Sequence, residues 1–403
     1  MKNVVIIGGG AAGLIAAIYA SKKNKVTIIE RNNCLGKKIL ITGNGRCNYY
    51  NENQNISKYH SENEEFIKNI INKNTNEEIL TFFKSLGIIP KIKNGYYYPY
   101  SESALSIKDA LLSELKNVNI KTNTLVTEII KKDKFIINPK TDNIKADIVI
   151  ITTGSKACPK TGSDGIGYEI AKNFGHHIIK PLPALVQLIG NKPYFKKWTG
   201  IRVDSIVKLY ENDKFVKEEE GQLQLTDYGL SGICIFNLSQ YVAKGLSKNK
   251  KEDIIINFMP WLKEDKMTWF ENQIKLLKNK KISELLEGFL NYKLVNVLLE
   301  IAKIKPNILC KSLNNKEKEN LINTLTKLKI NITNTKTFNE AQVCSGGVPL
   351  NEINTETMES LKIKDLYFAG EILDVNGDCG GYNLTFAWTT GMIAGLTKGN
   401  NND

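Results

Sequence analysis

The chain has 403 residues, which suits two or three domains, and 42% of them are hydrophobic, which suffices for packed cores. No apolar run reaches the ~18 residues that span a membrane, and glycines 8–10 interrupt the N-terminal run that resembles an export signal. A cytoplasmic protein without membrane contact is therefore expected. The seven scattered cysteines show no CxxC or zinc-type spacing, which predicts reduced thiols and no metal site.

The net charge of +13 raises the question of a nucleic-acid partner. The excess is almost entirely lysine and is spread through Lys/Asn-rich segments such as 244–251, 275–281 and 311–336. These segments lack the interleaved aromatic residues on which bases stack. A solvated lysine surface is the favoured interpretation, and nucleic acid is not the expected partner.

The first thirty residues carry the pattern around which the chain is organised. A buried strand at Val4–Ile7 leads into glycines with GxGxxG spacing, a small-residue helix and a second strand that ends on Glu30. In a dinucleotide fold, Gly8 allows the tight turn, Gly10 admits a pyrophosphate and Gly13 lets the helix pack closely. The helix N-terminus attracts the phosphates, and Glu30 is placed to bind the adenosine ribose. The alternative is a glycine-rich turn in an ordinary α/β domain.

A second glycine-bearing loop spans residues 42–48. It follows Lys38, contains Gly43 and includes Arg46, so it is polar and rich in hydrogen-bond donors. Such a loop suits phosphate or flavin contacts, although a plain surface turn is equally compatible with the spacing.

A hairpin with an Asn-Gly turn is predicted at residues 93–99, followed by an aromatic strand with Tyr96, Tyr97 and Tyr98. These tyrosines suit the wall of a planar ligand's site, and an aromatic edge strand is the commoner explanation. Further on, a buried strand at 146–151 runs into Thr153 and Gly154. In flavoproteins, the backbone after a strand that ends in Thr-Gly is a second segment that comes close to the nucleotide.

The middle of the chain changes character. Residues 203–225 predict an antiparallel meander, and residues 262–330 are mostly helical with apolar residues at helical spacing. Residues 226–232 are expected to cap a helix that runs to about residue 246. This region suits an inserted substrate or lid region and shows no recognisable chemistry.

The last sixty residues return to glycine-rich loops. A strand at 366–369 runs into Gly370, Glu371 and Asp374, and a Gly-Gly turn then precedes an apolar helix. Glu371 and Asp374 are expected to contact a ribityl chain, and the helix N-terminus to stabilise negative charge on a reduced flavin. We therefore expect the two ends of the chain to form one nucleotide-binding domain.

Taken together, these segments resemble the BaiN-like, or aminoacetone oxidase, family of FAD-binding oxidoreductases. The resemblance is carried by GGGAAGLIAA at 8–17, LGKKILITGNGRCN at 35–48, TGSKACPKTGSDGIGYEIAKNFGH at 153–176, LTDYGLSG at 225–232, CSGGVPLNEINTETMES at 344–360 and LYFAGEILDVNGDCGGYNLTFAWTTGMIAG at 366–395. It covers nearly the whole chain in order.

The resemblance implies an α/β architecture in three parts and non-covalent FAD. The expected parts are a discontinuous Rossmann-type FAD-binding domain at 1–185 and 340–403, a β-rich middle domain at 186–260 and 331–339, and a helical insertion at 261–330. The expected cofactor-binding residues are Gly8, Gly10, Ala11, Ala12, Gly13, Glu30, Arg31, Lys38, Thr42, Gly43, Arg46, Val126, Thr153, Gly154, Gly370, Glu371, Asp374, Gly381, Tyr382, Asn383 and Leu384.

The expected function is hydride transfer between FAD and a small organic substrate. The resemblance implies reduction of an activated double bond or oxidation of a small amine, and does not decide between them. NAD(P)H is a candidate transient reductant, because no second GxGxxG domain is present. The alternatives are an FAD protein that acts on or binds RNA, and a non-enzymatic flavin sensor. No catalytic acid or base, electron acceptor or oligomeric state is assigned.

Overall fold

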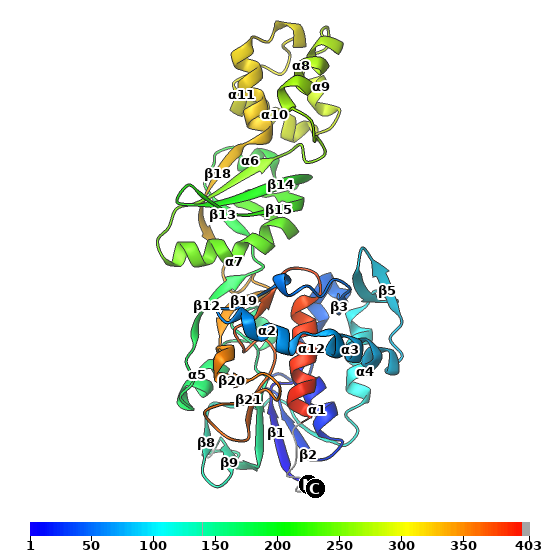
Figure 1. The fold of residues 1–403 in the computed structure, drawn as a ribbon, viewed down its shortest axis with the longest axis vertical. Helices are drawn as coiled ribbons and strands as arrows, with labels where there is room; N and C mark the ends of the chain where they lie inside the picture. The colour runs from blue at the N-terminus through cyan, green and yellow to red at the C-terminus, as the bar shows by residue number, and fades with distance from the viewer. Residues whose placement is uncertain (139, 397–403) are drawn as a thin grey trace. The chain divides into compact units, whose positions relative to one another are not determined.

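A computed structural model describes residues 1–138 and 140–396, and the chain divides into two compact units. Unit 1 comprises Met1–Leu182 and the segment from Ala341 onward, and unit 2 comprises Pro183–Glu340 (Figure 1). The divisions expected from the sequence are at 185/186 and 339/340, and they remain a prediction about domain organisation. Residues 397–403 of the expected FAD-binding domain lie outside the described residues.

A largely parallel sheet forms the centre of unit 1, which confirms the expected α/β fold. Its strands run in the order β20-β21-β22-β11-β1-β2-β7, with parallel pairing from β22 to β7. Val and Ile dominate β1 and β11 because both faces of these strands are buried. The strands are β1 (Asn3–Ile7), β2 (Lys25–Ile29), β7 (Val118–Lys121), β11 (Ile148–Ile151), β20 (Ile353–Asn354), β21 (Glu359–Ser360) and β22 (Leu366–Phe368).

Helices α1 (Ala11–Ala20) and α12 (Tyr382–Gly395) pack closely against each other, although they come from opposite ends of the chain (Figure 1). A Cβ on Gly391 would lie 2.4 Å from the Ala12 carbonyl oxygen, and one on Gly395 2.6 Å from that of Ala16. Only glycine permits this approach. The remaining helices of unit 1 are α2 (Ile67–Ile70), α3 (Lys73–Ser85), α4 (Ala104–Ser113) and α5 (Ile166–Asn173), with 3-10 turns η1 (Ile39–Gly45), η2 (Ile56–Lys58), η3 (Glu64–Phe66), η4 (Pro159–Thr161) and η6 (Leu350–Glu352).

Small sheets surround this centre. One is antiparallel in the order β10-β9-β8, and another, in the order β3-β6-β5, contains the expected hairpin. Their strands are β3 (Tyr50–Asn51), β5 (Pro90–Lys93), β6 (Tyr96–Pro99), β8 (Ile129–Lys131), β9 (Phe135–Ile137) and β10 (Ile144–Ala146). Two further sheets have two strands each. One pairs β4 (Tyr59–His60) with β23 (Asn376–Gly377), and the other pairs β12 (Ile179–Ala184) with β19 (Val343–Gly347).

Unit 2 is built on a closed barrel in the order β13-β16-β15-β14-β17-β18. Residues 229–232, expected as part of a helix cap, form strand β16 instead, because Gly229 and Gly232 have positive φ and approach neighbouring strand backbone closely. The helix then begins at Ile233. The strands are β13 (Leu188–Gly190), β14 (Arg202–Glu211), β15 (Lys214–Leu225), β16 (Gly229–Gly232), β17 (Glu252–Asn257) and β18 (Leu328–Thr335).

Helices cover the barrel and continue into the segment expected as a helical insertion. Buried residues of the barrel, such as Val207 and Leu225, belong to the same hydrophobic core as Leu294 and Leu298 of the helices. The barrel and the helical segment therefore share one core. The helices are α6 (Phe195–Trp198), α7 (Ile233–Ser247), α8 (Lys266–Leu276), α9 (Ile282–Glu287), α10 (Tyr292–Ala302) and α11 (Asn315–Thr326), with the 3-10 turn η5 (Cys310–Ser312).

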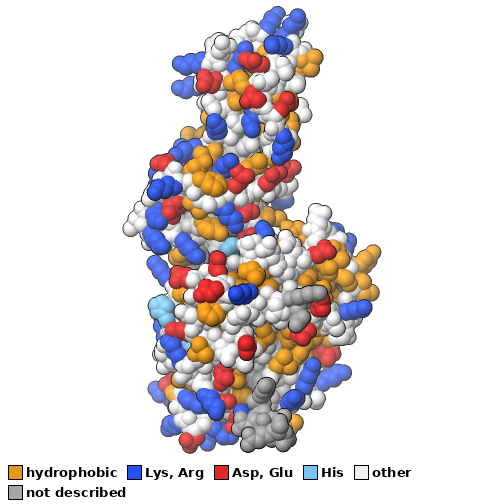
Figure 2. All heavy atoms as spheres, viewed as in Figure 1, with side chains coloured by type: hydrophobic (Ala, Val, Ile, Leu, Met, Phe, Trp, Pro, Cys, Tyr) orange, Lys and Arg blue, Asp and Glu red, His pale blue; other side chains and the backbone are white. Residues whose placement is uncertain are grey.

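Charge is dispersed on the surface. Figure 2 shows Lys and Arg side chains scattered over the visible face, with Asp and Glu among them. Among the described residues, no helix combines the length and the apolar composition that a bilayer crossing requires.

Candidate functional site

Four neighbouring parallel strands of unit 1 each end at residues that the sequence assigned to cofactor binding. Strand β1 is followed by Gly8–Gly13, β2 by Glu30, β11 by Thr153–Gly154 and β22 by Gly370–Asp374. In open parallel sheets, ligands bind at the carboxyl ends of the strands. The fold therefore brings these four segments to the edge of the sheet where a nucleotide is expected.

The turn between β1 and α1 has the geometry of a phosphate cradle. Gly8 has φ of +103°, and a Cβ there would lie 2.6 Å from the Thr152 carbonyl oxygen. A Cβ on Gly13 would lie 2.0 Å from the carbonyl oxygen of Gly8, whereas one on Gly10 would meet nothing within 4 Å. Helix α1 starts after Gly10 with no side-chain cap and no acid in its first turn. The open position and the uncapped N–H groups suit an anion.

Glu30 is fixed beside this turn. Its side chain is buried, Oε2 accepts a hydrogen bond from Gly9 N at 2.8 Å, and Oε1 accepts from Asn32 N at 2.8 Å and Asn32 Nδ2 at 2.7 Å. A carboxylate offers about four lone-pair positions, so one acceptor position remains for a ribose hydroxyl.

The residues beside Glu30 take different positions. Arg31 forms an ion pair with Asp164 and is partly exposed. The segment that leads to Val126 runs alongside, because Thr124 N donates to the Glu30 carbonyl oxygen at 3.0 Å. Val126 itself is buried. Arg31 is thus held by the protein, and Val126 lies near the end of the site expected for adenine.

Lys38 and Glu371, 333 residues apart in sequence, meet in an ion pair with Nζ and Oε2 2.6 Å apart. The other Glu371 oxygen accepts from Ser155 Oγ at 2.6 Å and from Cys344 N at 3.2 Å. Burial raises the pKa of the Cys344 thiol to about 11, so it stays protonated at neutral pH. This network ties three loops together at the carboxyl edge of the sheet.

The glycine-bearing loop at 42–48 has a left-handed backbone, with φ of 55° at Gly43 and 56° at Asn44. Thr42 Oγ1 donates to the carbonyl oxygen of residue 39 at 2.6 Å. The Arg46 guanidinium lies over the ring of Tyr98, 5.2 Å from its centroid. Thr42 is thus committed to its own turn, and Arg46 is exposed.

Thr153 and Gly154 follow β11 and face different neighbours. The Thr153 hydroxyl is buried without a hydrogen-bond partner among the described residues and points at Gly167 of α5, where a Cβ would lie 1.9 Å from it. Gly154 has φ of +71°, and a Cβ there would lie 2.7 Å from Ser163 Oγ. The Thr153 side chain therefore faces α5, and the backbone of this turn forms the edge of the sheet.

Asp374 is buried, and its carboxylate accepts hydrogen bonds from the loop at residues 61–62. Its Oδ2 accepts hydrogen bonds from Ser61 Oγ at 3.1 Å and Glu62 N at 2.8 Å. Gly370 N donates to Thr390 Oγ1 of α12 at 2.9 Å. The two carboxylates predicted to contact a ribityl chain, Glu371 and Asp374, thus both have internal partners, which the sequence did not predict.

The N-terminus of α12 resembles that of α1. It begins after Gly381, whose φ is +95°, and has no side-chain cap and no acid in its first turn. Asn383 exchanges hydrogen bonds with the backbone of Gly377 at 2.8 and 2.9 Å, which fixes the preceding loop. Burial raises the pKa of Tyr382 to about 12. Leu384 is half-buried.

The two uncapped helices run in parallel, because Ala12 meets Gly391 and Ala16 meets Gly395. At 1.5 Å per residue, the N-terminus of α12 extends about 12 Å beyond that of α1 in the same direction. Two positive helix ends are thus offset along one line. FAD carries a pyrophosphate and, beyond a five-carbon chain, a ring that becomes negative on reduction. The donors and open glycine positions of this chain fit that cofactor.

The sequence missed several residues that shape this site. Asn32 orients Glu30, Ser155 orients Glu371, and the tyrosine rings of the β5–β6 hairpin touch two of the glycine loops. Asn32 and Ser155 follow predicted site residues by one or two positions, which is a usable signal. The tyrosine run was noticed, but the pattern did not reveal which ring faces which loop.

Two of the histidines have strong partners. His176 is buried and has Glu352 Oε2 and Ser360 Oγ each 2.8 Å from a ring nitrogen, which favours a structural role. His60 Nε2 lies 2.8 Å from Asp378 Oδ1. Within the described ranges, no group of three or more His, Cys, Asp or Glu side chains could hold a metal ion.

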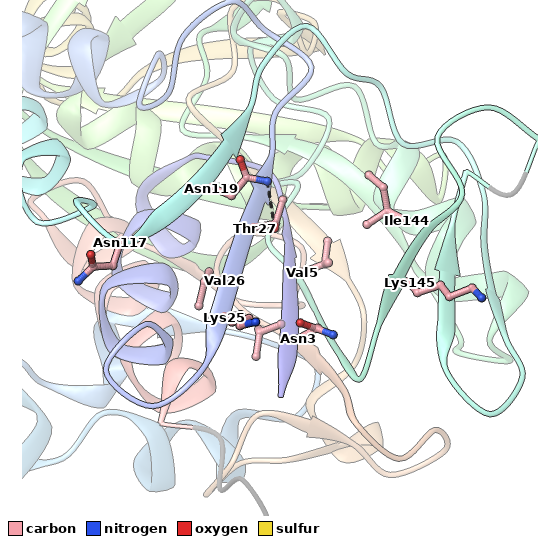
Figure 3. Close-up of a pocket in the computed structure, with 10 residues that line it drawn as sticks. Asn3, Val5, Lys25, Val26, Thr27, Asn117, Asn119, Ile144 and Lys145 are labelled. Atoms are coloured by element: carbon pink, nitrogen blue, oxygen red, sulfur yellow. Dashed lines mark hydrogen bonds between the residues drawn. The ribbon is translucent and has the colours of Figure 1, made fainter. Parts of the chain in front are cut away.

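A separate cavity of about 370 Å³ lies against the sheet near Asn3, Lys25, Thr27, Asn119 and Lys145. Figure 3 shows these side chains around the hollow, with Asn119 Nδ2 3.4 Å from Thr27 Oγ1. Asn3 and Lys25 are the first residues of β1 and β2. The cavity is therefore at the amino ends of the strands, away from the segments that fit a nucleotide.

Comparisons with known proteins agree with the Rossmann-type fold. A family model described as "HI0933-like protein Rossmann domain" matches residues 2–397. The 3-dehydro-bile acid delta(4,6)-reductase of Clostridium scindens is 39% identical over 402 residues, 98% of each chain. A ribosomal RNA dihydrouridine synthase of Escherichia coli is 30% identical over 395 residues, 96% of each chain. The structure of a 3-ketosteroid delta1-dehydrogenase from Sterolibacterium denitrificans covers 98% of this chain and 99% of its own, with a TM-score of 0.50 and 10% identity, a likeness of fold.

Proposed function

Because the chain belongs to the HI0933-like family of Rossmann-domain proteins and is an FAD-dependent oxidoreductase, we propose that it reduces a carbon–carbon double bond conjugated to a carbonyl group. The substrate of this proposal is a small ring-containing molecule, and NAD(P)H is the transient electron donor. The reaction takes place in the cytoplasm, where its seven free cysteines stay reduced.

The two curated relatives support this substrate class through the chemistry in their names. A 3-dehydro bile acid with delta(4,6) unsaturation has a ketone conjugated to its double bonds, and the double bond lost in dihydrouridine is conjugated to a ring carbonyl. In both molecules the carbonyl withdraws electrons, so the far alkene carbon accepts a hydride. The relative with 39% identity acts on the former, which favours a small molecule over RNA.

In this proposal each part of the site has one task. The N–H groups of the first turn of α1 hold the pyrophosphate, and Glu30 binds the adenosine ribose. The network of Lys38, Glu371 and Ser155 orients the ribityl chain, and the α12 N-terminus faces the ring. FAD would supply the hydride chemistry, and the protein would bind and orient the cofactor and substrate and provide the electrostatic environment. A proton for the second alkene carbon must come from a protein group or from water.

The observation that carries the proposal is the second uncapped helix end. The first turn of α12 holds no acid, and its glycine N-cap leaves the N–H groups without a side-chain acceptor. A helix N-terminus stabilises negative charge that develops nearby. An enzyme that must accept electrons from NAD(P)H before it reduces a substrate gains from such a stabilised reduced state.

Anaerobic mixing tests the proposal. NADH or NADPH should bleach the visible flavin absorbance, and a conjugated ketone such as 2-cyclohexen-1-one should restore it without oxygen. A saturated ketone, cyclohexanone, is the matched control and should leave the flavin reduced. Restoration by oxygen alone, with no response to any conjugated carbonyl compound, would contradict a reductase and indicate an oxidase.

A uracil base in ribosomal RNA is the second candidate substrate. It is favoured by the 30% identity to an RNA-modifying relative and by the net charge of +13. On the face that Figure 2 shows, the lysines are scattered among acidic side chains and form no continuous basic track of the kind that RNA binding uses. Mass spectrometry of ribosomal RNA from cells with and without the gene distinguishes the two candidates. A dihydrouridine that disappears with the gene supports RNA, and unchanged RNA supports the small molecule.

A further inference from the structure

The β5–β6 hairpin presents two tyrosines to two loops that the sequence assigned to the flavin. Tyr96 and Tyr98 alternate with Tyr97 along β6 and therefore share one face of the strand. A Cβ on Gly380 would lie 2.6 Å from Tyr96 Cε1, and one on Gly43 would lie 3.5 Å from Tyr98 Cε1. The shared face thus touches both the turn before α12 and the left-handed loop at 42–48.

The third tyrosine of the run has a different surrounding. The ring of Tyr97 packs edge-on against Tyr49 and Tyr50, with centroids 6.3 and 5.2 Å apart. It therefore belongs to the core on the other face of the strand. By contrast, no hydrogen bond joins the hydroxyl of Tyr96 or Tyr98 to another described residue, and both rings are half-buried. Their hydroxyls are available to a substrate.

Tyr98 differs from Tyr96 in that the exposed Arg46 guanidinium lies over its ring. Several other proton donors of unit 1 are paired, buried or exposed to solvent. Lys38 is paired with Glu371, His176 is bonded through both ring nitrogens, and His177 is exposed. His60 is held by Asp378. Burial raises the pKa of the Cys47 thiol to about 12, and the thiol is fully enclosed.

We propose that Tyr96 is the acid that gives the substrate its proton when the conjugated double bond is reduced. This inference rests on the proposed function. FAD, when bound and reduced, would supply the hydride to the alkene carbon far from the carbonyl, and the π electrons of the substrate would move to its carbonyl oxygen to form an enolate. The carbon next to the carbonyl then takes the proton of the Tyr96 hydroxyl, and water returns a proton to the phenolate.

The surroundings of Tyr96 keep this proton in place until it is needed. Burial raises the pKa of Tyr96, and nearby Cys379, Tyr98 and Asp378 add to the rise. The hydroxyl is therefore protonated throughout the neutral range. General acids of this kind typically contribute 10²- to 10⁴-fold to a rate.

The first experiment locates Tyr96 without measuring activity. The FAD-loaded protein is labelled with 3-fluorotyrosine, and the fluorine signals of Tyr96 and Tyr100 are identified from Tyr96→Phe and Tyr100→Phe. Tyr100 is 67% exposed and lies past the end of the strand. Dithionite reduction of the flavin should shift the Tyr96 signal and leave the Tyr100 signal in place. An unmoved Tyr96 signal would overturn the proposal.

The second experiment separates the two half-reactions. In Tyr96→Phe, reduction of the flavin by NAD(P)H should stay within about twofold of wild type, and reoxidation by the conjugated ketone should slow by roughly 10²- to 10⁴-fold. Tyr100→Phe should behave as wild type in both. Equal reoxidation rates in Tyr96→Phe and wild type would overturn the role of Tyr96 and leave the proposed function standing. A wild type that no conjugated ketone reoxidises would instead remove the proposed function.

If Tyr96→Phe does not fold, the pH profile of the wild type separates a phenol donor from a histidine donor. A phenol donor predicts a ketone-dependent rate that is constant from about pH 6 to about pH 9. A fall in this rate between about pH 6 and pH 7 would indicate a histidine donor and contradict the proposal.

Discussion

Two buried glutamates, one in each unit, differ in their hydrogen bonding. Glu30 in unit 1 is 7% exposed and accepts three hydrogen bonds, from Gly9 and Asn32. Glu252 in unit 2 is 1% exposed, and neither carboxyl oxygen has a partner among the described residues. Burial, with a smaller effect of Glu211, raises the pKa of Glu252 to about 8.

The difference shows that burial alone does not identify a binding residue. Backbone and amide donors aimed at Glu30 occupy three of the roughly four acceptor positions of its carboxylate and leave one for a ligand. Glu252 lies against Gly245, where a Cβ would come within 1.7 Å of its Oε1, and pairs across the strands with Glu211. No described residue donates a hydrogen bond to it, so it remains largely protonated at neutral pH. Hydrogen-bond donors, and not depth of burial, distinguish Glu30 from Glu252.

The largest effect is expected when the Glu30 side chain is removed. Glu30→Ala should weaken FAD binding about ten- to a hundredfold, which corresponds to the ~1.5–3 kcal/mol of a charge-assisted hydrogen bond. FAD titration of the apoprotein measures this change. Glu252→Ala is the matched control in the other unit and should leave FAD affinity unchanged. Equal FAD affinities for Glu30→Ala and wild type would contradict the proposal that Glu30, unlike Glu252, binds the cofactor.

A gain in stability is expected when Glu252 is made neutral. Its folded-state pKa of about 8 lies above the ordinary 4.5, so the unfolded chain releases this proton first, and stability is lost as the pH rises between these values. Glu252→Gln should raise the free energy of unfolding at pH 8 by about 1–3 kcal/mol. At pH 4 the gain should vanish. Denaturant unfolding at both pH values tests this, and an equal gain at both would contradict the unpaired carboxyl.

The smallest effect is expected at a glutamate near the surface. Hydrogen bonds from Lys91 and Lys93 lower the pKa of Glu102 to about 2, and its side chain is 30% exposed, far more than Glu30 or Glu252. Exposed ion pairs contribute little, because water and salt screen them. Glu102→Gln should therefore leave the melting temperature unchanged at neutral pH and in high salt. A clear drop would show that paired donors matter even without burial.

Much of the fold could be predicted because its signals are local. The Gly8–Gly13 turn, the strands on either side of α1 and the return of the chain end to the first unit all follow from short-range patterns. The parallel sheet and the FAD-binding family are confirmed. The expected domain boundaries and the individual residues expected to bind FAD remain predictions.

The partners of the site residues could not be predicted, because they come from distant segments. Asp374 accepts from Ser61, 313 residues away, and no sequence spacing announces that contact. The same holds for Glu252, which is followed in its strand by a second buried carboxylate, Asp253. Tyr96 and Tyr97 are identical neighbours, and only the pleat of β6 determines which of them reaches Gly380.

The packing of the C-terminal helix α12 against the N-terminal part of the chain also delays completion of unit 1 during synthesis. Trp388 of α12 donates a hydrogen bond to the Tyr49 carbonyl oxygen, 339 residues earlier in the chain. At ~5–20 residues per second, a ribosome needs roughly 20 to 70 seconds to make the intervening segment. During that time the turn at Gly8–Gly13 exists without the helix that completes its site. A nascent chain can therefore fold its barrel first, and firm capture of FAD waits until α12 has been made.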